Sequence, residues 1–198
     1  MFGTEKQKTG YPSIDKPWLK FYDKALNESD IPECSAYHLL YQNNKDYMDD
    51  VALIYFNRKI KFKELFENIR KTAMSLTALG IGKGDIVTLQ VLNMPQTVYL
   101  FYALSYIGAV ANMIYFSASV KETNEILINT KSKMYIAIDS LWETHKESIK
   151  KTDVQHVLLL KIAESADVVT RTIINIKSKA VKAATVSYTH LRAHETLA

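Results

Sequence analysis

The six residues from Gly80 to Asp85, with the sequence GIGKGD, have the composition of a loop that binds phosphate. Glycines let backbone amides approach phosphate oxygens, and a lysine can neutralise their charge. Such loops follow a strand and open a helix, because the helix N-terminus supplies the amides. Here the glycines follow a predicted helix and precede a predicted strand. Thr77 and Gly84 also stand where a Walker motif requires a glycine and a hydroxyl residue. We therefore interpret residues 80–85 as a tight turn.

Histidine and cysteine are the other reactive side chains, but their spacing supports no site. His190 and His194 are four residues apart, as two zinc ligands on one face of a helix are. The glutamate that a zinc-protease motif carries between its two histidines is absent. Cys34 is the only cysteine, so the chain can form neither an internal disulfide nor a cysteine-rich metal site. No histidine and acid accompany it as a nucleophile would require. The remaining histidines are isolated and are expected on the surface or at a strand edge: His38, His145 and His156.

An aromatic series lies in the apolar segment that follows the glycine turn. Tyr99, Phe101, Tyr102 and Tyr106 have helical spacing, which favours packing in the core over a platform for stacking a ligand. The sequence therefore presents no catalytic, cofactor-binding or metal-binding constellation, and we assign no residue to any of those roles.

The composition is that of a globular protein. The 198 residues are 47% hydrophobic and 23% charged, which is enough for one domain with a core. The net charge of +4 comes from lysines scattered among acidic residues, and no basic cluster with stacking aromatics indicates a nucleic-acid-binding protein. The polar N-terminus and the single cysteine favour the cytoplasm over secretion.

One stretch is long and apolar enough to raise the alternative of a membrane span. No charged residue lies between Asp85 and Lys121, and residues 98–116 are almost wholly apolar. A span needs roughly 20 apolar residues. Gly108 and Asn112 divide this run into a helix-sized and a strand-sized piece, and a parallel sheet buried on both faces gives the same pattern. We favour the buried sheet.

After residue 50 the sequence predicts alternating strands and helices. A hairpin turns at Asn57-Arg58. Asn93 is the predicted N-cap of one helix, which Pro95 starts and Gly108 ends, and Ser119 with Glu122 forms a capping box at the start of another. The predicted strands are residues 51–56, 59–62, 86–92, 110–114, 134–138 and 156–160, and the predicted helices are 63–79, 95–107, 119–129 and 142–150. This order indicates an α/β fold, a partial layered and largely parallel sheet flanked by helices.

The rest of the chain lies outside this alternation. Residues 1–50 are expected to form an extended arm on the domain surface and a short helix that Ser35 caps and that ends near Tyr41. Residues 51–184 would form the sheet subdomain, with a basic amphipathic helix over 168–184. Residues 185–198 fit no earlier pattern, and we interpret them as a foreign, adapter-like tail.

Three segments in order resemble the AMP-binding adenylation superfamily, which includes acyl-CoA synthetases, peptide-synthetase adenylation domains and luciferases. IKFKEL at residues 60–65 is similar to the family's Thr-Tyr-x-Glu-Leu helix opening. LGIGKGDIV at residues 79–87, followed by Asn93-Met94-Pro95, is similar to its Gly-Val-x-Lys-Gly-Asp-x-Val turn and its Asn-x-Pro. LSYIGAV at residues 104–110 is similar to its Leu-x-x-Gly-Ala motif. Residues 9–18 and 111–114 look most like bacterial fatty acyl-CoA synthetase-like members.

The sequence departs from the family pattern in two places. Lys61 replaces the usual threonine, so the following helix loses its expected cap, which is worth about 1 kcal/mol. Tyr115-Phe116 stand where many members have a polar residue or histidine followed by proline. The local loop and the substrate class are therefore open at this point.

The resemblance implies a two-step reaction. A carboxylate attacks the α-phosphate of ATP, with Mg²⁺ balancing charge, to give an acyl-adenylate and pyrophosphate. A thiol of coenzyme A or of a carrier protein then displaces AMP. The family's phosphate loop and catalytic lysine lie later in its sequence order, so no catalytic residue is carried over to this chain. The matching residues have scaffold character: Glu64, Gly80, Gly84, Asp85 and Gly108.

The expected function is accordingly that of a truncated AMP-dependent ligase. Its parent would activate a fatty acid with ATP, Mg²⁺ and coenzyme A, whereas this chain alone would be inactive and bind none of them well. The alternative is a non-catalytic α/β module that binds a nucleotide or a partner. The alternative predicts a cooperatively unfolding monomer, whereas a fragment would expose apolar sheet edges.

Overall fold

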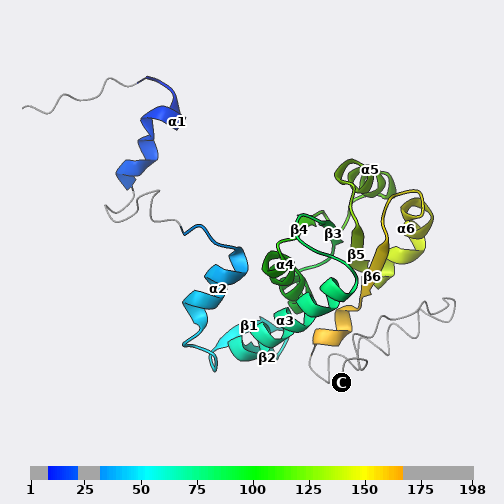
Figure 1. The fold of residues 1–198 in the computed structure, drawn as a ribbon, viewed down its shortest axis with the longest axis horizontal. Helices are drawn as coiled ribbons and strands as arrows, with labels where there is room; N and C mark the ends of the chain where they lie inside the picture. Colours follow the sequence, from blue (N-terminus) through cyan, green and yellow to red (C-terminus); the bar gives the residue numbers. More distant parts are fainter. Residues whose placement is uncertain (1–8, 22–31, 167–198) are drawn as a thin grey trace, which may run out of the picture. The chain divides into compact units, whose positions relative to one another are not determined.

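The computed structural model describes residues 9–21 and 32–166. The chain divides into two compact units, Met1–Cys34 and Ser35–Ala198, and Figure 1 shows their elements. The helix predicted over 168–184 and the tail 185–198 lie outside the described residues.

The expected N-terminal arm contains two short helical segments in its described part, α1 (Pro12–Asp15) and η1 (Pro17–Phe21). The sequence had predicted no regular element there. The carboxylate of Asp15 accepts hydrogen bonds from the backbone amides of Thr9 and Gly10, both at 2.8 Å. A proline at the start of α1 also holds the backbone near helical φ. These local interactions explain the short turns.

The second unit begins with helix α2 (Ala36–Asn44) and a two-stranded hairpin, β1 (Val51–Tyr55) and β2 (Arg58–Lys61). Ser35 Oγ accepts the amide of His38 at 3.2 Å, which confirms the predicted cap, although the helix continues past Tyr41. The hairpin turn is Phe56-Asn57 and not the predicted Asn57-Arg58, because Tyr55 pairs with Arg58. Phe56 therefore takes a positive φ of 51°.

A four-stranded parallel sheet forms the centre of the second unit, in the order β4-β3-β5-β6. Its strands are β3 (Ile86–Gln90), β4 (Val110–Met113), β5 (Met134–Ile138) and β6 (His156–Leu160). Val87 pairs with Ala111 on one side and with Met134 on the other, so β3 is an inner strand. The bounds of β5 and β6 are as predicted, whereas β3 and β4 end earlier, at Gln90 and Met113.

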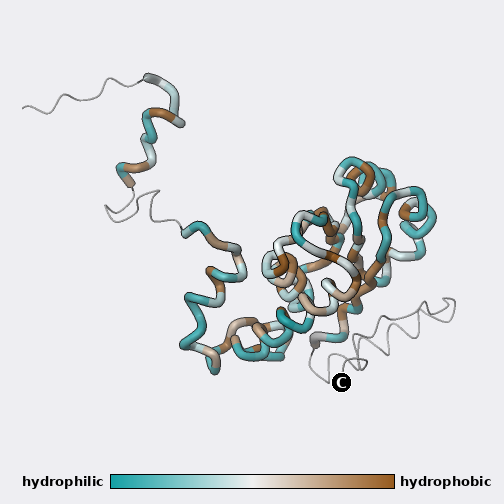
Figure 2. Tube along the Cα trace, viewed as in Figure 1, coloured by the Kyte–Doolittle hydropathy of each residue, from teal (hydrophilic) through white to brown (hydrophobic). Residues whose placement is uncertain are grey.

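Helices cover both faces of this sheet (Figure 1). On one face, α3 (Phe62–Ala78) and α4 (Pro95–Ile107) pack on apolar residues of β3 and β5 such as Leu89 and Ile136. On the other face, α5 (Val120–Thr130) and α6 (Trp142–Ile149) pack on Tyr135 and Ala137. Burying each aliphatic side chain contributes about 1.5–3 kcal/mol. Figure 2 shows apolar residues along the strands and polar residues on the outer turns of α5 and α6. The α/β architecture predicted from the sequence is confirmed.

The helix ends follow the sequence signals with one correction. Ser119 and Glu122 form the predicted capping box: Glu122 Oε2 accepts the Ser119 amide at 2.8 Å, and Ser119 Oγ accepts the Glu122 amide at 3.3 Å. Helix α3 begins after Lys61 without a side-chain cap in the described structure, as the loss of threonine predicted. The N-cap of α4 is Met94 and not Asn93, because the Met94 carbonyl accepts the amide of Thr97 at 3.0 Å.

The remaining elements are short 3-10 turns, η3 (Asp139–Leu141) after β5 and η4 (Ile162–Ser165) after β6. Among residues 9–21 and 32–166 no helix has both the length and the apolar character that a membrane crossing requires. The apolar run considered above is divided between α4 and β4.

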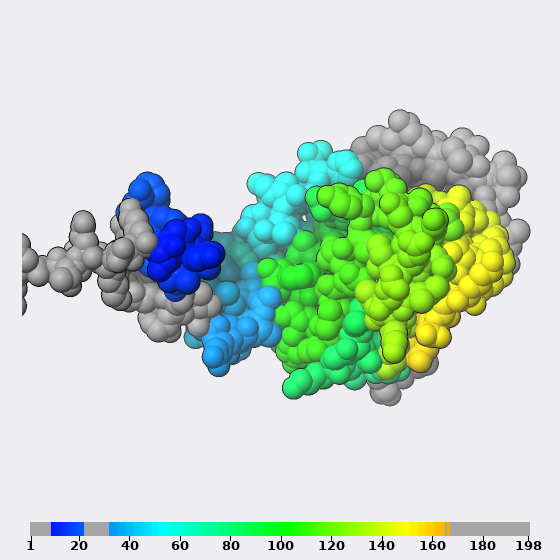
Figure 3. Space-filling view, turned by 90° about the horizontal axis from the view of Figure 1, so that it is seen from above, coloured from blue at the N-terminus to red at the C-terminus, as the bar shows by residue number. Residues whose placement is uncertain are grey.

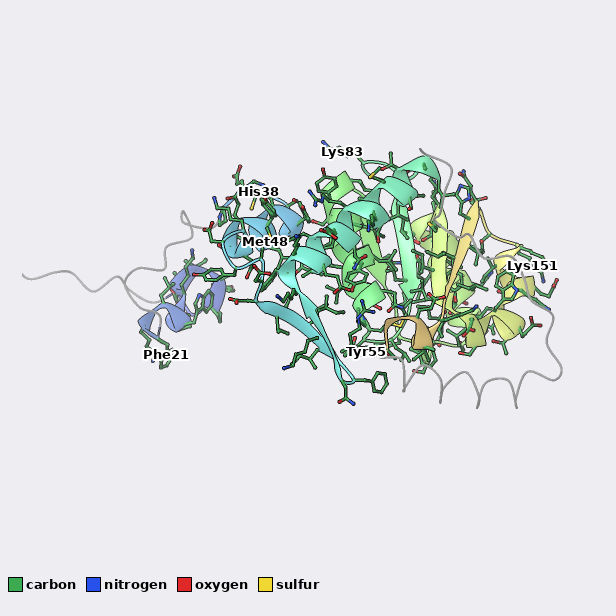
Figure 4. All side chains as sticks on the ribbon, turned by 90° about the horizontal axis from the view of Figure 1, so that it is seen from below. Phe21, His38, Met48, Tyr55, Lys83 and Lys151 are labelled. Atoms are coloured by element: carbon green, nitrogen blue, oxygen red, sulfur yellow. The ribbon has the colours of Figure 1, made fainter. Side chains whose placement is uncertain are left out.

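The glycine-rich segment 80–85 is the predicted tight turn, and it joins α3 to the amino end of β3. Gly80 and Gly84 have φ of +79° and +84°. Asp85 Oδ2 accepts the amide of Gly82 at 2.8 Å and the ammonium of Lys133 at 2.8 Å. Lys133 Nζ also donates to the Gly80 carbonyl at 2.7 Å, and Figure 4 shows Lys83 on the outside where α3 ends. The Gly82 amide is thus occupied by the chain's own carboxylate and not by a phosphate.

Substitutions at Gly108 and Gly82 test the left-handed backbone conformation at the end of α4. Gly108 has φ of +78° at the end of α4, and an added Cβ would lie 3.2 Å from Lys83 Cγ. Gly108→Ala is expected to lower the free energy of unfolding by about 1–2 kcal/mol, because alanine disfavours that backbone conformation. Gly82→Ala is the control, since its φ is not positive and an added Cβ would meet nothing within 4 Å. Urea unfolding of both variants should separate them, and equal losses would contradict the assigned geometry.

The Asp85 carboxylate predicts an acid dependence of stability. The hydrogen bond from Lys133, and then that from Gly82, lower the pKa of Asp85 in the folded protein. The folded state then binds fewer protons than the unfolded state, so this contribution is present above about pH 4 and is lost as the pH falls further. Asp85→Asn should be less stable than the wild type near neutral pH. The difference should shrink towards about pH 2. Urea unfolding across this range measures it, and a difference independent of pH would contradict the assignment.

Candidate functional site

The histidines and the cysteine considered from the sequence do not come together. His38 is exposed and His156 is half-buried at the start of an edge strand, as expected. The surface prediction for His145 is wrong: it is 4% exposed, and its Nδ1 lies 2.9 Å from the Leu141 carbonyl. The side of α6 that carries His145 packs against the sheet, which explains the burial. Cys34 is exposed, and His190 and His194 lie outside the described residues.

The aromatic series of α4 is only partly in the core. Tyr99 and Tyr102 pack against it, as predicted, because they lie on the helix face towards the apolar cluster. Phe101 and Tyr106 are 38% and 53% exposed, so the core prediction is wrong for these two. The ring of Tyr106 instead contacts that of Tyr37 from α2, with centroids 4.7 Å apart.

The strand order places a candidate site at the carboxyl end of the sheet. The chain leaves β3 for β4 on one side and then crosses to β5 on the other side. In open parallel sheets ligands bind outside the carboxyl ends of the strands, where the order reverses in this way. The last residue of β3 at this point is Gln90, and the segment that follows β4 is residues 114–119.

Gln90 is fully buried and connects this segment to the sheet and to α5. Its Nε2 donates to the carbonyls of Phe116 at 3.2 Å and Ala118 at 3.1 Å. Its Oε1 accepts the hydroxyl of Thr123 at 3.1 Å and that of Tyr135 at 2.6 Å. The amide thus has a partner for each of its two donors and for two lone pairs, which is the full set that a glutamine side chain offers.

The two hydroxyl groups that donate to Gln90 Oε1 belong to buried residues. Tyr135 is 0% exposed and Thr123 is 1% exposed. Burial raises the pKa of Tyr135, and its phenol therefore stays protonated and donates to Gln90.

A second group of hydrogen-bonded side chains lies on the same face of the sheet. Thr88 Oγ1 and Ser132 Oγ are 2.5 Å apart, and Asn112 Nδ2 donates to Thr88 Oγ1 at 2.9 Å.

Residues 114–119 border an open hollow of about 430 Å³. Tyr115 is 86% exposed, although it is among the largest side chains of this segment. In Figure 3 the green residues that include this part of the chain form much of the visible surface of the second unit. The hollow is lined by Met113, Ile114, Tyr115, Ser117, Ala118, Glu122 and Ile126. Its lining is mostly apolar with one carboxylate.

Sequence reasoning identified Tyr115 and Phe116 as a departure from the family but missed Gln90 and Tyr135. A signal was present, because Thr88 and Gln90 alternate with the apolar residues Val87 and Leu89 in the predicted strand. Alternation of this kind marks one polar face of a strand. Among the described residues, no group of three or more His, Cys, Asp or Glu side chains could hold a metal ion.

Comparison with known proteins gives related sequences and folds. A family model described as AMP-binding enzyme matches residues 40–196. Acetyl-coenzyme A synthetase of Shewanella putrefaciens is 30% identical over 142 residues, which cover 69% of this chain and 21% of that protein. The Bartonella henselae enzyme of the same name is 26% identical over 168 residues, covering 76% and 26%. The chain therefore spans about a quarter of the length of these relatives.

Solved structures show the same fold. The anthranilate CoA ligase AuaEII, in complex with anthranoyl-AMP, superposes with a TM-score of 0.63 at 22% identity, covering 68% of this chain and 27% of that one. A long-chain-fatty-acid-CoA ligase from Archaeoglobus fulgidus gives 0.62 at 21% identity, covering 72% and 30%. The N-terminal subdomain of Klebsiella oxytoca NpsA gives 0.54 at 26% identity, covering 72% and 32%.

These matches agree with the three motifs, with the parallel order β4-β3-β5-β6 and with the helices on both faces. The chain belongs to the AMP-binding enzyme family, and its sheet and helices have the fold of the N-terminal subdomain of adenylate-forming ligases.

Proposed function

We propose that this chain is the N-terminal part of a ligase that joins a carboxylic acid to a thiol by way of an acyl-adenylate. In the first step a carboxylate oxygen bonds to the α-phosphorus of ATP and pyrophosphate leaves. In the second, the thiol sulfur bonds to the acyl carbon and AMP leaves. The observation that carries the proposal is the match to the AMP-binding enzyme family over residues 40–196.

The acid that we propose is a fatty acid and the acceptor is coenzyme A. The acetyl-CoA synthetase relatives and the long-chain-fatty-acid-CoA ligase neighbour support an aliphatic acid and this thiol. A carrier-protein thiol is the other acceptor to compare, because NpsA-ThdA is an adenylation–PCP di-domain. We propose a cytoplasmic location, which the single cysteine of the sequence supports.

The described residues are proposed to serve as scaffold and not as catalysts. The 198-residue sequence contains no Ser/Thr/Gly-rich loop ending in lysine, and its GIGKGD turn is tied to Asp85 and Lys133. Phosphoryl-group chemistry depends on placing positive charge and donors around the phosphates. This chain contributes the sheet and the hollow at its carboxyl end, and the phosphate-binding groups belong to another part of the enzyme.

The chain by itself is expected to be inactive. Purified residues 1–198 should give no ATP–pyrophosphate exchange above the protein-free blank with acetate, palmitate or anthranilate, because the phosphate-binding groups are not in this sequence. The Shewanella putrefaciens acetyl-CoA synthetase provides the positive control. Exchange by the chain alone, at a rate that rises with its concentration, would show that the catalytic groups lie within it.

A chimera tests the parent activity. The aligned 142 residues of the Shewanella putrefaciens enzyme are replaced by the matching residues of this chain. We expect ATP–pyrophosphate exchange to be retained, because the two segments share one scaffold role. Ranking acetate, palmitate and anthranilate by kcat/KM then tests the proposed acid class. A chimera that is folded by circular dichroism and thermal unfolding, yet gives no exchange with any acid, would refute the proposal.

A further inference from the structure

Two of the hydrogen bonds that hold the segment 114–119 come from the Gln90 side chain. Tyr115 and Ser117 are exposed, so their side chains contribute little burial that could fix the backbone. Ile114 still pairs with β3 through a 3.0 Å bond from its amide to the Leu89 carbonyl. Ser119 is fixed at the other end by the capping box. Between these two points the carbonyls of Phe116 and Ala118 both accept from Gln90 Nε2.

A glutamine side chain satisfies this arrangement in full, because it offers two donors and two acceptor lone pairs. A carboxylate at position 90 would place negative charge against two carbonyl oxygens, whereas an apolar side chain would leave the two carbonyls and two hydroxyls without their present partner. The hydroxyls of Thr123 and Tyr135 hold Oε1 and so orient Nε2 towards the loop. The conformation of the loop is thereby coupled to α5 through Thr123 and to β5 through Tyr135.

We infer that Gln90 is a positioning residue that sets the backbone of residues 114–119 and, through Tyr115 and Ala118, the shape of the hollow at the carboxyl end of β4. The positioning of the loop stands on the hydrogen bonds alone. The further statement that this hollow contacts a ligand rests on the proposed function. Gln90 acts through the loop, and we assign it no contact with a reacting atom.

The test compares three variants of the full 198-residue chain. Gln90→Met removes all four hydrogen bonds at similar volume, and Gln90→Glu removes the donors while keeping the acceptors. Thr88→Val is the matched control, because it removes buried hydrogen bonds from the same face of the same strand but none from the loop. Amide hydrogen exchange is followed at Ala118, which donates to Tyr115, and at Lys133, which donates to Ile86 in the sheet.

Gln90→Met is expected to raise the ratio of exchange at Ala118 to exchange at Lys133 by several-fold to about tenfold. Thr88→Val should not raise that ratio, because a loss of sheet stability would increase exchange at Lys133. In Gln90→Glu the ratio should be raised at about pH 7 and should fall part of the way back on acidification to about pH 5, because the protonated carboxyl group donates again to one of the two carbonyls. An unchanged ratio in both Gln90 variants, or an equal rise in Thr88→Val, would overturn the inference.

The role of the hollow is tested separately in the chimeric enzyme. Gln90→Met there should lower kcat/KM for ATP–pyrophosphate exchange more than Thr88→Val does at matched thermal stability. If the loop loosens in the isolated chain while exchange by the chimera is unaffected, the positioning role of Gln90 stands and the hollow is not part of the ligand site. If the parent chimera is folded but inactive, the proposed function fails and the result for the loop is unaffected.

Discussion

The burial of β3 between β4 and β5 is the constraint on which the rest of the second unit depends. Its residues pair in parallel on both edges, and helices cover both faces of the sheet. Every backbone group of such a strand must find its partner within the sheet, since water does not reach it. The turns that enter and leave the strand must therefore keep one conformation. At the amino end of β3, the ion pair between Asp85 and Lys133 stabilises that turn.

The same burial makes the polar residues of β3 expensive unless they are fully hydrogen-bonded. Thr88 and Gln90 are 0% exposed, and an unpaired amide at this depth would cost on the order of 1–3 kcal/mol. Each finds partners on β4, β5, α5 or the segments next to them. These hydrogen bonds offset the free-energy cost of burying polar side chains, and those of Gln90 also position the 114–119 loop against the strands. The same hydrogen-bond network therefore belongs to the scaffold and to the candidate site.

Motifs that act locally were predictable. The capping box at Ser119, the cap at Ser35 and the missing cap at Lys61 each involve atoms within one helical turn. Two local assignments were nevertheless wrong: Tyr55 pairs with Arg58, which moves the hairpin turn by one residue, and Met94 takes the place of Asn93 as the N-cap of α4. The burial of His145 is an error of another kind, because it depends on the packing of α6 against residues distant in the sequence.

The sequence by itself determined the α/β alternation, the glycine turn and the family, because hydrophobic period, backbone permissiveness and motif spacing are properties of short segments. Only the tertiary structure decided the strand order, the place beside Gln90 where that order reverses, and the exposure of Tyr115 at the edge of the hollow. These features depend on contacts between residues far apart in the chain. Gln90 and Tyr135, 45 positions apart, meet only because their strands are adjacent in the sheet.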